Sequence, residues 1–300
     1  MRIKSFRAAA IAAVATAALA APAFADHSWS TYHWQKGTGP LRVDVGDNVD
    51  SKWDRYLEEA MNGGPYTNPP GGDGQGWNAT AHIDSPIVAG RSNPKNCKAV
   101  SGTIQVCNSR YGQTGWLGIA QIWLSGGHIV QGITKLNDTY FDTAKYSTPA
   151  WRRLVMCQEV GHDYGLGHTN EIFDNYNDGT CMDYTNAPSG GMLGTKDYGP
   201  SNEYINQHDH DQLNAIYSHS HSNFTAVGPG RSGSAVGRPP HELDGAIGGD
   251  SPAEWGRAVA TDGRGRPHIF VQDLGNGNRK ITHVFWTLEH RGGGHHNHDH

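Results

Sequence analysis

The fold and chemistry that we expect are set by the stretch Gln158-Glu159-Val160-Gly161-His162-Asp163-Tyr164-Gly165-Leu166-Gly167-His168. In a helix, residues four apart lie on one face, so Gln158 and His162 point the same way. Gly165 accepts left-handed backbone angles at little cost, so the chain can leave the helix there and bring His168 towards His162. Two imidazoles and a third donor around Zn²⁺, with one position open for water, form the arrangement that a catalytic zinc site needs.

The stretch resembles the extended zinc signature H-E-x-x-H-x-x-G-x-x-H of metzincin-type zinc metalloproteases, a group that includes the matrixins, astacins and snapalysin-like enzymes. Glu159, His162, Gly165 and His168 fall on matching positions, and Gln158 stands where the family has its first ligand histidine. The resemblance implies a secreted zinc-dependent endopeptidase. Zinc would be held by His162, His168 and Gln158, and peptide bonds would be hydrolysed by metal-activated water with Glu159 as the general base.

A second motif, Cys181-Met182-Asp183-Tyr184, resembles the Met-turn of the same family. The resemblance implies that Met182 lies under the metal and that Tyr184 donates a hydrogen bond in the transition state. It also implies an α+β metzincin-like catalytic domain, with a twisted mixed sheet, an active-site helix, a Met-turn and a C-terminal helix. The strand at 128–136 would then be the antiparallel strand at the cleft edge, where it would pair with the backbone of a protein or peptide substrate.

Gln158 leaves two functions open. Its amide oxygen can coordinate zinc, and it lies only about 40° around the helix from His162, whereas Cys157 lies about 140° away. An amide is a poorer donor than imidazole, so the alternative is a catalytically impaired, metzincin-like secreted binding protein. A hydrolase with a serine or cysteine nucleophile is a third interpretation, but the sequence contains no G-x-S-x-G elbow.

The ends of the chain differ in composition from the middle. Residues 1–25 combine early cations, an apolar run and Ala23-Phe24-Ala25, which is typical of a cleaved export signal. Its removal would take the formal net charge from −5 to −8, so we expect no nucleic-acid partner. Its apolar run is too short to span a bilayer and no later segment qualifies, so we expect a secreted, extracellular protein that does not bind membrane after signal cleavage. We expect it to be a monomer. The expected organisation is a signal peptide (1–25), a metzincin-like domain (26–221), a Gly/Ser/Pro linker (222–250), a small β-hairpin appendage (251–290) and a His-rich tail (291–300).

Four cysteines in an exported chain predict two disulfides, with three possible connectivities. We favour the short-range pairs Cys97–Cys107 and Cys157–Cys181, because the second would tie the metal helix to the Met-turn. A zinc–thiolate site is the alternative, but neither pair has the close C-x₂₋₄-C spacing that usually indicates one.

Hydrophobic periodicity and capping residues place the remaining elements. Thr148-Pro149 supplies a hydroxyl cap and a first-turn proline for the metal helix. The acidic stretch 171–180 either holds calcium or, as we favour, forms a solvated turn. We expect strands at 41–45, 103–106, 116–123 and 128–136, helices beginning near 51 and 209, and a hairpin of 267–273 with 280–287.

Overall fold

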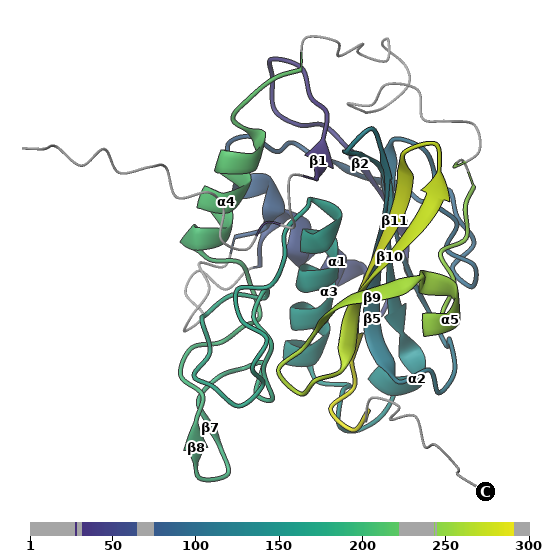
Figure 1. The fold of residues 1–300 in the computed structure, drawn as a ribbon. Helices are drawn as coiled ribbons and strands as arrows, with labels where there is room; N and C mark the ends of the chain where they lie inside the picture. Colours follow the sequence, from purple (N-terminus) through teal and green to yellow (C-terminus); the bar gives the residue numbers. More distant parts are fainter. Residues whose placement is uncertain (1–27, 29–31, 65–74, 222–242, 244, 291–300) are drawn as a thin grey trace, which may run out of the picture.

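The computed structural model describes residues 28, 32–64, 75–221, 243 and 245–290 (Figure 1). The predicted export signal and His-rich tail lie outside the described residues, as does most of the predicted linker. The helices are α1 (Asp54–Asn62), η1 (Trp77–Ala79), α2 (Asp138–Phe141), α3 (Pro149–Asp163), α4 (Gln207–Tyr217) and α5 (Pro252–Trp255). The strands are β1 (His33–Trp34), β2 (Asp44–Asn48), β3 (Ile87–Ala89), β4 (Thr103–Ser109), β5 (Trp116–Ser125), β6 (His128–Asn137), β7 (Met192–Leu193), β8 (Lys196–Asp197), β9 (Arg257–Thr261), β10 (Pro267–Gly275) and β11 (Asn278–Trp286).

The fold is α+β and is built on one mixed sheet in the order β3-β2-β4-β6-β5-β11-β10-β9, with β1 added beside β6. The neighbours β3, β2, β4 and β6 run parallel to one another. From β5 onwards every pairing is antiparallel. Figure 1 shows α1 and α3 together on one side of this sheet, with the hairpin of β10 and β11 beside β5. The α+β class is therefore confirmed.

The expectation for the sheet edge was wrong. The strand that we expected at the edge, β6, lies inside the sheet between β4 and β5. The antiparallel neighbour β5 is also covered, because β11 pairs with it from Asn278↔Ser125 to Trp286↔Trp116. The predicted hairpin is confirmed, but it continues the main sheet and is not an appendage beside it. Strand pairing between distant segments leaves no local sequence pattern, which is why the partner of β11 was not predicted.

The helix α3 begins as its sequence predicts. The Thr148 side chain accepts a hydrogen bond from the amide of Trp151, and Pro149 occupies the first turn. Every residue from Trp151 to Asp163 is buried. A helix buried on all sides is normally apolar, yet this one encloses six polar side chains, namely those of Arg152, Arg153, Gln158, Glu159, His162 and Asp163. Arg153 is paired with Glu59 and Glu203, whereas the Oε1 of Gln158 has no hydrogen-bond partner among the described residues, which marks the second half of the helix as a candidate site.

Both predicted disulfides are present, Cys97–Cys107 and Cys157–Cys181. The second joins α3 to the turn that contains Met182, as expected. Among the described residues, no helix combines the length and apolar character needed to cross a membrane.

Candidate metal centre

The two predicted histidine ligands lie together at the end of α3. His162 Nε2 and His168 Nε2 are 3.1 Å apart. Gly165 makes this possible with a φ of +92°, and its amide closes the helix end onto the carbonyl of His162 at 3.0 Å. A Cβ at this glycine would also lie only 2.4 Å from the carbonyl oxygen of Tyr32. A left-handed residue without a side chain is therefore required at this turn.

The other nitrogen of His162 is hydrogen-bonded to a backbone carbonyl, and that of His168 lies near a carboxylate. His162 Nδ1 lies 2.7 Å from the carbonyl oxygen of Leu166 and donates to it. His168 Nδ1 lies 3.4 Å from Glu171 Oε1. With a proton on each Nδ1, both Nε2 atoms carry lone pairs that point at one another. Lone pairs at this separation repel unless a proton or a cation lies between them, and imidazoles oriented by a carbonyl or carboxylate are typical of metal ligands.

The surroundings keep both imidazoles neutral. Burial lowers the pKa of His162 well below its usual value, and the neighbouring His283 and His168 add to this effect. Burial also lowers the pKa of His168 to about 4, although Glu171 opposes the shift. A neutral imidazole is the form that binds a metal. The pair is therefore in the ligand form throughout the neutral pH range.

Glu159 is fully buried against the antiparallel strand β5. Burial raises the pKa of its carboxyl group well above the usual range, the charge of Asp163 adds to the rise, and the nearby amide of Ala120 opposes it. Room for the side chain comes from Gly118, where a Cβ would lie 2.9 Å from Glu159 Oε1. A buried carboxyl group with a raised pKa is typical of groups that act as general acids or bases.

Gln158 is turned towards the Met-turn. Its Nε2 donates to the carbonyl oxygen of Cys181 at 2.6 Å. Its Oε1 is buried and accepts no hydrogen bond from the described residues. The opposite amide orientation would set two oxygens against each other, so the Oε1 atom is the one left without a partner. A buried polar atom without a partner is rare and is consistent with a ligand position.

Met182 packs against the helix of this centre, and Tyr184 packs against His168. The Met182 sulfur packs against α3 at Gly161, where a Cβ would lie 2.6 Å from it. The Tyr184 ring lies 4.3 Å from that of His168, centroid to centroid. The Tyr184 hydroxyl donates to the carbonyl oxygen of Val284 at 3.2 Å and also lies 3.1 Å from His268 Nδ1. The proposed transition-state donor is thus engaged by β10 and β11.

Three further polar residues of this centre, His283, His268 and Glu171, were not predicted as site residues from the sequence. The His283 ring of β11 stacks on that of His162 at 4.1 Å. His268 of β10 stacks on His168 at 5.2 Å, and its Nε2 lies 3.2 Å from Glu171 Oε1. His168, Glu171 and His268 offer ligand atoms that all lie within 4.8 Å of one another.

A weak sequence signal for one of these residues exists. His283 alternates with Ile281 and Phe285, so the three share one strand face. Both apolar neighbours are fully buried. A histidine between two core residues on one face is a candidate for a buried polar role, but nothing in its spacing relates it to α3.

Comparison with known protein families finds no family model that matches this chain, and comparison with curated proteins finds no matching sequence.

Proposed function

We propose that this chain is a secreted zinc-dependent endopeptidase of the metzincin type, in a closed form in which its own C-terminal strands cover β5 and the histidine pair. The observation that carries the proposal is the pair of Nε2 atoms of His162 and His168, 3.1 Å apart. Glu159 lies on the same helix, one turn before His162. This is the combination of two imidazoles and a buried base that metal-dependent peptide hydrolysis requires.

The residues fit a divalent cation. His162 and His168 would hold it through Nε2, and the unpartnered Oε1 of Gln158 is the available third donor. When bound, the ion supplies Lewis-acid chemistry that lowers the pKa of water and polarises a peptide carbonyl. The Glu159 carboxylate would accept the proton of the attacking water and deliver it to the leaving amine. Tyr184 would donate its hydroxyl hydrogen to the developing oxyanion.

The closed form is proposed from the contacts of β11. This strand occupies the whole length of β5, the position at which an extended peptide would add to the sheet. It also stacks His283 on His162 and binds the Tyr184 hydroxyl through Val284. The same strand therefore contacts one proposed ligand and one proposed catalytic group. A substrate could pair with β5 only after β11 has moved away.

The catalytic assignment is tested with Glu159→Gln, using Glu58→Gln on the exposed face of α1 as the matched control. Cleavage of an unfolded protein and zinc content by elemental analysis are measured on the secreted protein. Glu159→Gln should lower the cleavage rate by about 10²–10⁴-fold while zinc is retained, and Glu58→Gln should change neither. Full cleavage by Glu159→Gln would show that this glutamate is not the base.

The closed form is tested with Phe285→Ala, which removes a buried ring of β11 that packs 4.9 Å from Tyr184. Phe141→Ala removes an equally buried ring away from the hairpin, against Trp53. Each change should destabilise the fold by about 3–5 kcal/mol. Only Phe285→Ala should raise the cleavage rate, since only it loosens the cover. Equal cleavage rates for the two variants would refute the proposed closed form.

A second candidate is a zinc-binding protein without peptidase activity. It is favoured by one specific observation, the Gln158 amide that is already bound to the carbonyl of Cys181. In that case zinc would be present and sensitive to loss of His162, but neither the unaltered chain nor Phe285→Ala would cleave protein.

A further inference from the structure

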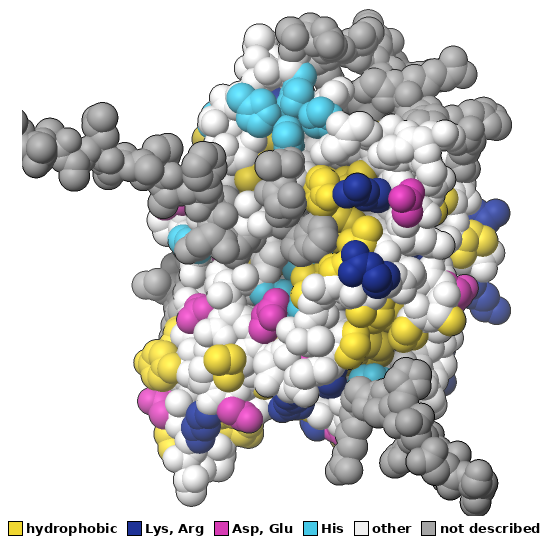
Figure 2. All heavy atoms as spheres, in the orientation of Figure 1, with side chains coloured by type: hydrophobic (Ala, Val, Ile, Leu, Met, Phe, Trp, Pro, Cys, Tyr) yellow, Lys and Arg dark blue, Asp and Glu magenta, His cyan; other side chains and the backbone are white. Residues whose placement is uncertain are grey.

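A second group of histidines, formed by other elements, lies at the surface. Figure 2 shows a cluster of histidine side chains at the top of the molecule, near β1 and the end of α4 as labelled in Figure 1. His33 belongs to β1, His128 begins β6, and His219 and His221 follow α4. None of these residues takes part in the proposed peptidase chemistry.

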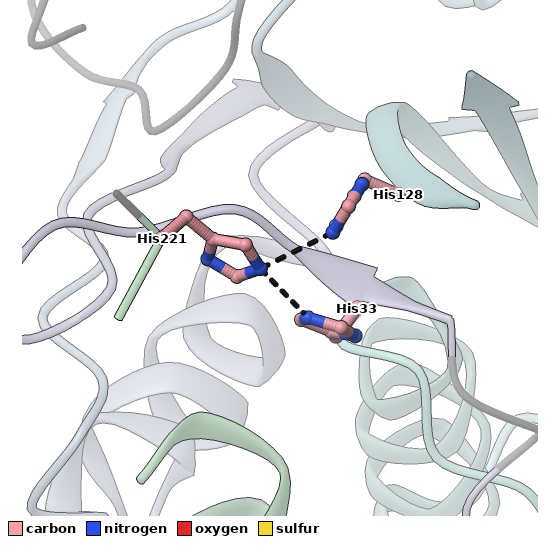
Figure 3. Close-up of side chains that lie close together, drawn as sticks. All are labelled: His33, His128 and His221. Carbon is pink, nitrogen blue, oxygen red and sulfur yellow. Dashed lines mark hydrogen bonds between the residues drawn. The ribbon is translucent and has the colours of Figure 1, made fainter. Parts of the chain in front are cut away.

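The imidazole nitrogens of this group converge. His221 Nε2 lies 3.2 Å from His33 Nε2 and 3.1 Å from His128 Nε2 (Figure 3). His33 Nε2 also lies 3.1 Å from His219 Nε2. The ligand atoms of His33, His128 and His221 all lie within 4.8 Å of one another. Three separate segments of the chain therefore direct nitrogen donors to one point.

Hydrogen bonds among the rings explain this geometry poorly. A neutral imidazole carries one N–H, so an Nε2 atom can donate one hydrogen or accept, but not both. Both His221 Nε2 and His33 Nε2 face two other nitrogens. A metal ion between the rings would accept a lone pair from each nitrogen, which accounts directly for their convergence. Zinc–nitrogen bonds of about 2.0–2.1 Å in a tetrahedron place the nitrogens about 3.3–3.4 Å apart, close to the separations seen here.

Two neighbouring residues contact the outer nitrogens of these rings. The Gln35 amide nitrogen lies 3.3 Å from His128 Nδ1, and the Lys36 backbone nitrogen lies 3.3 Å from His221 Nδ1. Each is a long contact. Binding through Nε2 places a proton on Nδ1, so the Lys36 contact would be lost, while Gln35 can turn its amide oxygen to accept.

We propose that His33, His128 and His221 bind a divalent transition-metal ion such as Zn²⁺. His219, whose Nε2 lies 3.1 Å from His33 Nε2, is the nearest further donor. Imidazole donors suit zinc, copper and nickel rather than magnesium or calcium. If the His219 ring turns to complete the shell, four protein ligands leave no open position, which is typical of a structural site. The ion would link β1, the start of β6 and the segment after α4. This site is independent of the proposed peptidase centre.

The test counts zinc on the full mature chain after removal of free metal. The tail is a competing binder, so all variants carry asparagine at its histidines, namely His295, His296, His298 and His300. The parent should bind two zinc ions and the double variant His128→Gln/His221→Gln one. His82→Gln, a matched change outside both clusters, should keep two.

The outcomes separate the two sites. His162→Gln/His168→Gln should also bind one zinc ion, at the surface site. If the peptidase centre binds no metal, the parent binds one ion and His128→Gln/His221→Gln none, which still supports this proposal. The proposal is overturned if His128→Gln/His221→Gln holds as much zinc as the parent.

A spectroscopic measurement keeps the proposal testable if the double variant fails to fold. Cobalt(II) is added to the His162→Gln/His168→Gln protein, which retains the whole surface cluster. Visible absorption bands of tetrahedral, nitrogen-bound cobalt that zinc abolishes would support the site. Absence of zinc-sensitive bands would overturn it.

Discussion

Gly118→Ala is the sharpest probe of how Glu159 is placed. A Cβ at this position would lie 2.6 Å from Val155 Cγ1, 2.8 Å from Glu159 Cγ and 2.9 Å from Glu159 Oε1. The strand cannot retreat, because Gly118 pairs with Leu136 on one side and Phe285 on the other. The methyl group must therefore displace α3 side chains within a packed core, which typically costs about 1–3 kcal/mol.

The same substitution also stiffens the unfolded chain, which contributes up to about 1 kcal/mol in the opposite direction. Gly39→Ala is the matched control, since a Cβ there meets nothing within 4 Å. Urea unfolding of metal-free protein, with equal m values as a check of two-state behaviour, gives both free energies. We expect Gly118→Ala to be less stable than Gly39→Ala by about 1–3 kcal/mol.

Activity provides the second readout of this substitution. Displacement of Glu159 by even about 1 Å can lower the rate of a positioned base by two orders of magnitude. Gly118→Ala should therefore lose cleavage activity while Gly39→Ala keeps it. Equal stability of the two variants would refute the reasoning, because Glu159 would then not be pressed against β5.

Three further predictions concern the same centre. In metal-free protein, Glu159→Gln should be more stable than the parent at pH 8 and equal to it near pH 4. The raised pKa of Glu159 means that the ionised carboxylate is unfavourable in the fold, and this penalty vanishes when the pH falls below the usual glutamate pKa of 4.5. Urea unfolding at both pH values measures the difference, and equal stability at pH 8 would contradict the prediction. Replacing Cys157 and Cys181 by alanine opens a bridge with a sequence separation of 24, and should lower the free energy of unfolding by about 3–4 kcal/mol in the chain-entropy model. Glu171→Gln should weaken zinc binding about 10–100-fold through loss of the carboxylate behind His168, measured by competition with a chelator.

What could be predicted from the sequence is what depends on neighbours in the chain. Thr148 and Pro149 predict the start of α3, and Gly165 predicts the turn that returns His168 to His162. The strands of the hairpin were also found, because alternation and turn residues are local signals. The mixed α+β class follows from these elements.

What could not be predicted depends on contacts between distant segments. His268 and His283 come from strands about a hundred residues beyond α3, and no spacing rule connects them to it. The edge strand was misplaced for the same reason, since the pairing of β5 with β11 is fixed only in the folded sheet. The surface cluster could not be predicted for the same reason, because His33, His128 and His221 lie far apart from one another in the chain.

Because the C-terminal strands extend the sheet, they also change which strand forms its edge. The outermost strand is now β9, a short and largely exposed strand that contains Arg257 and pairs with β10 through irregular registers. Short edge strands with charged side chains and irregular pairing resist strand pairing with other molecules. The strand that they conceal, β5, is long and apolar, from Trp116 to Leu124. Any event that detaches the hairpin would therefore expose a long apolar edge strand. Unless a peptide then paired with that strand, the protein would be prone to self-association through edge-to-edge strand pairing.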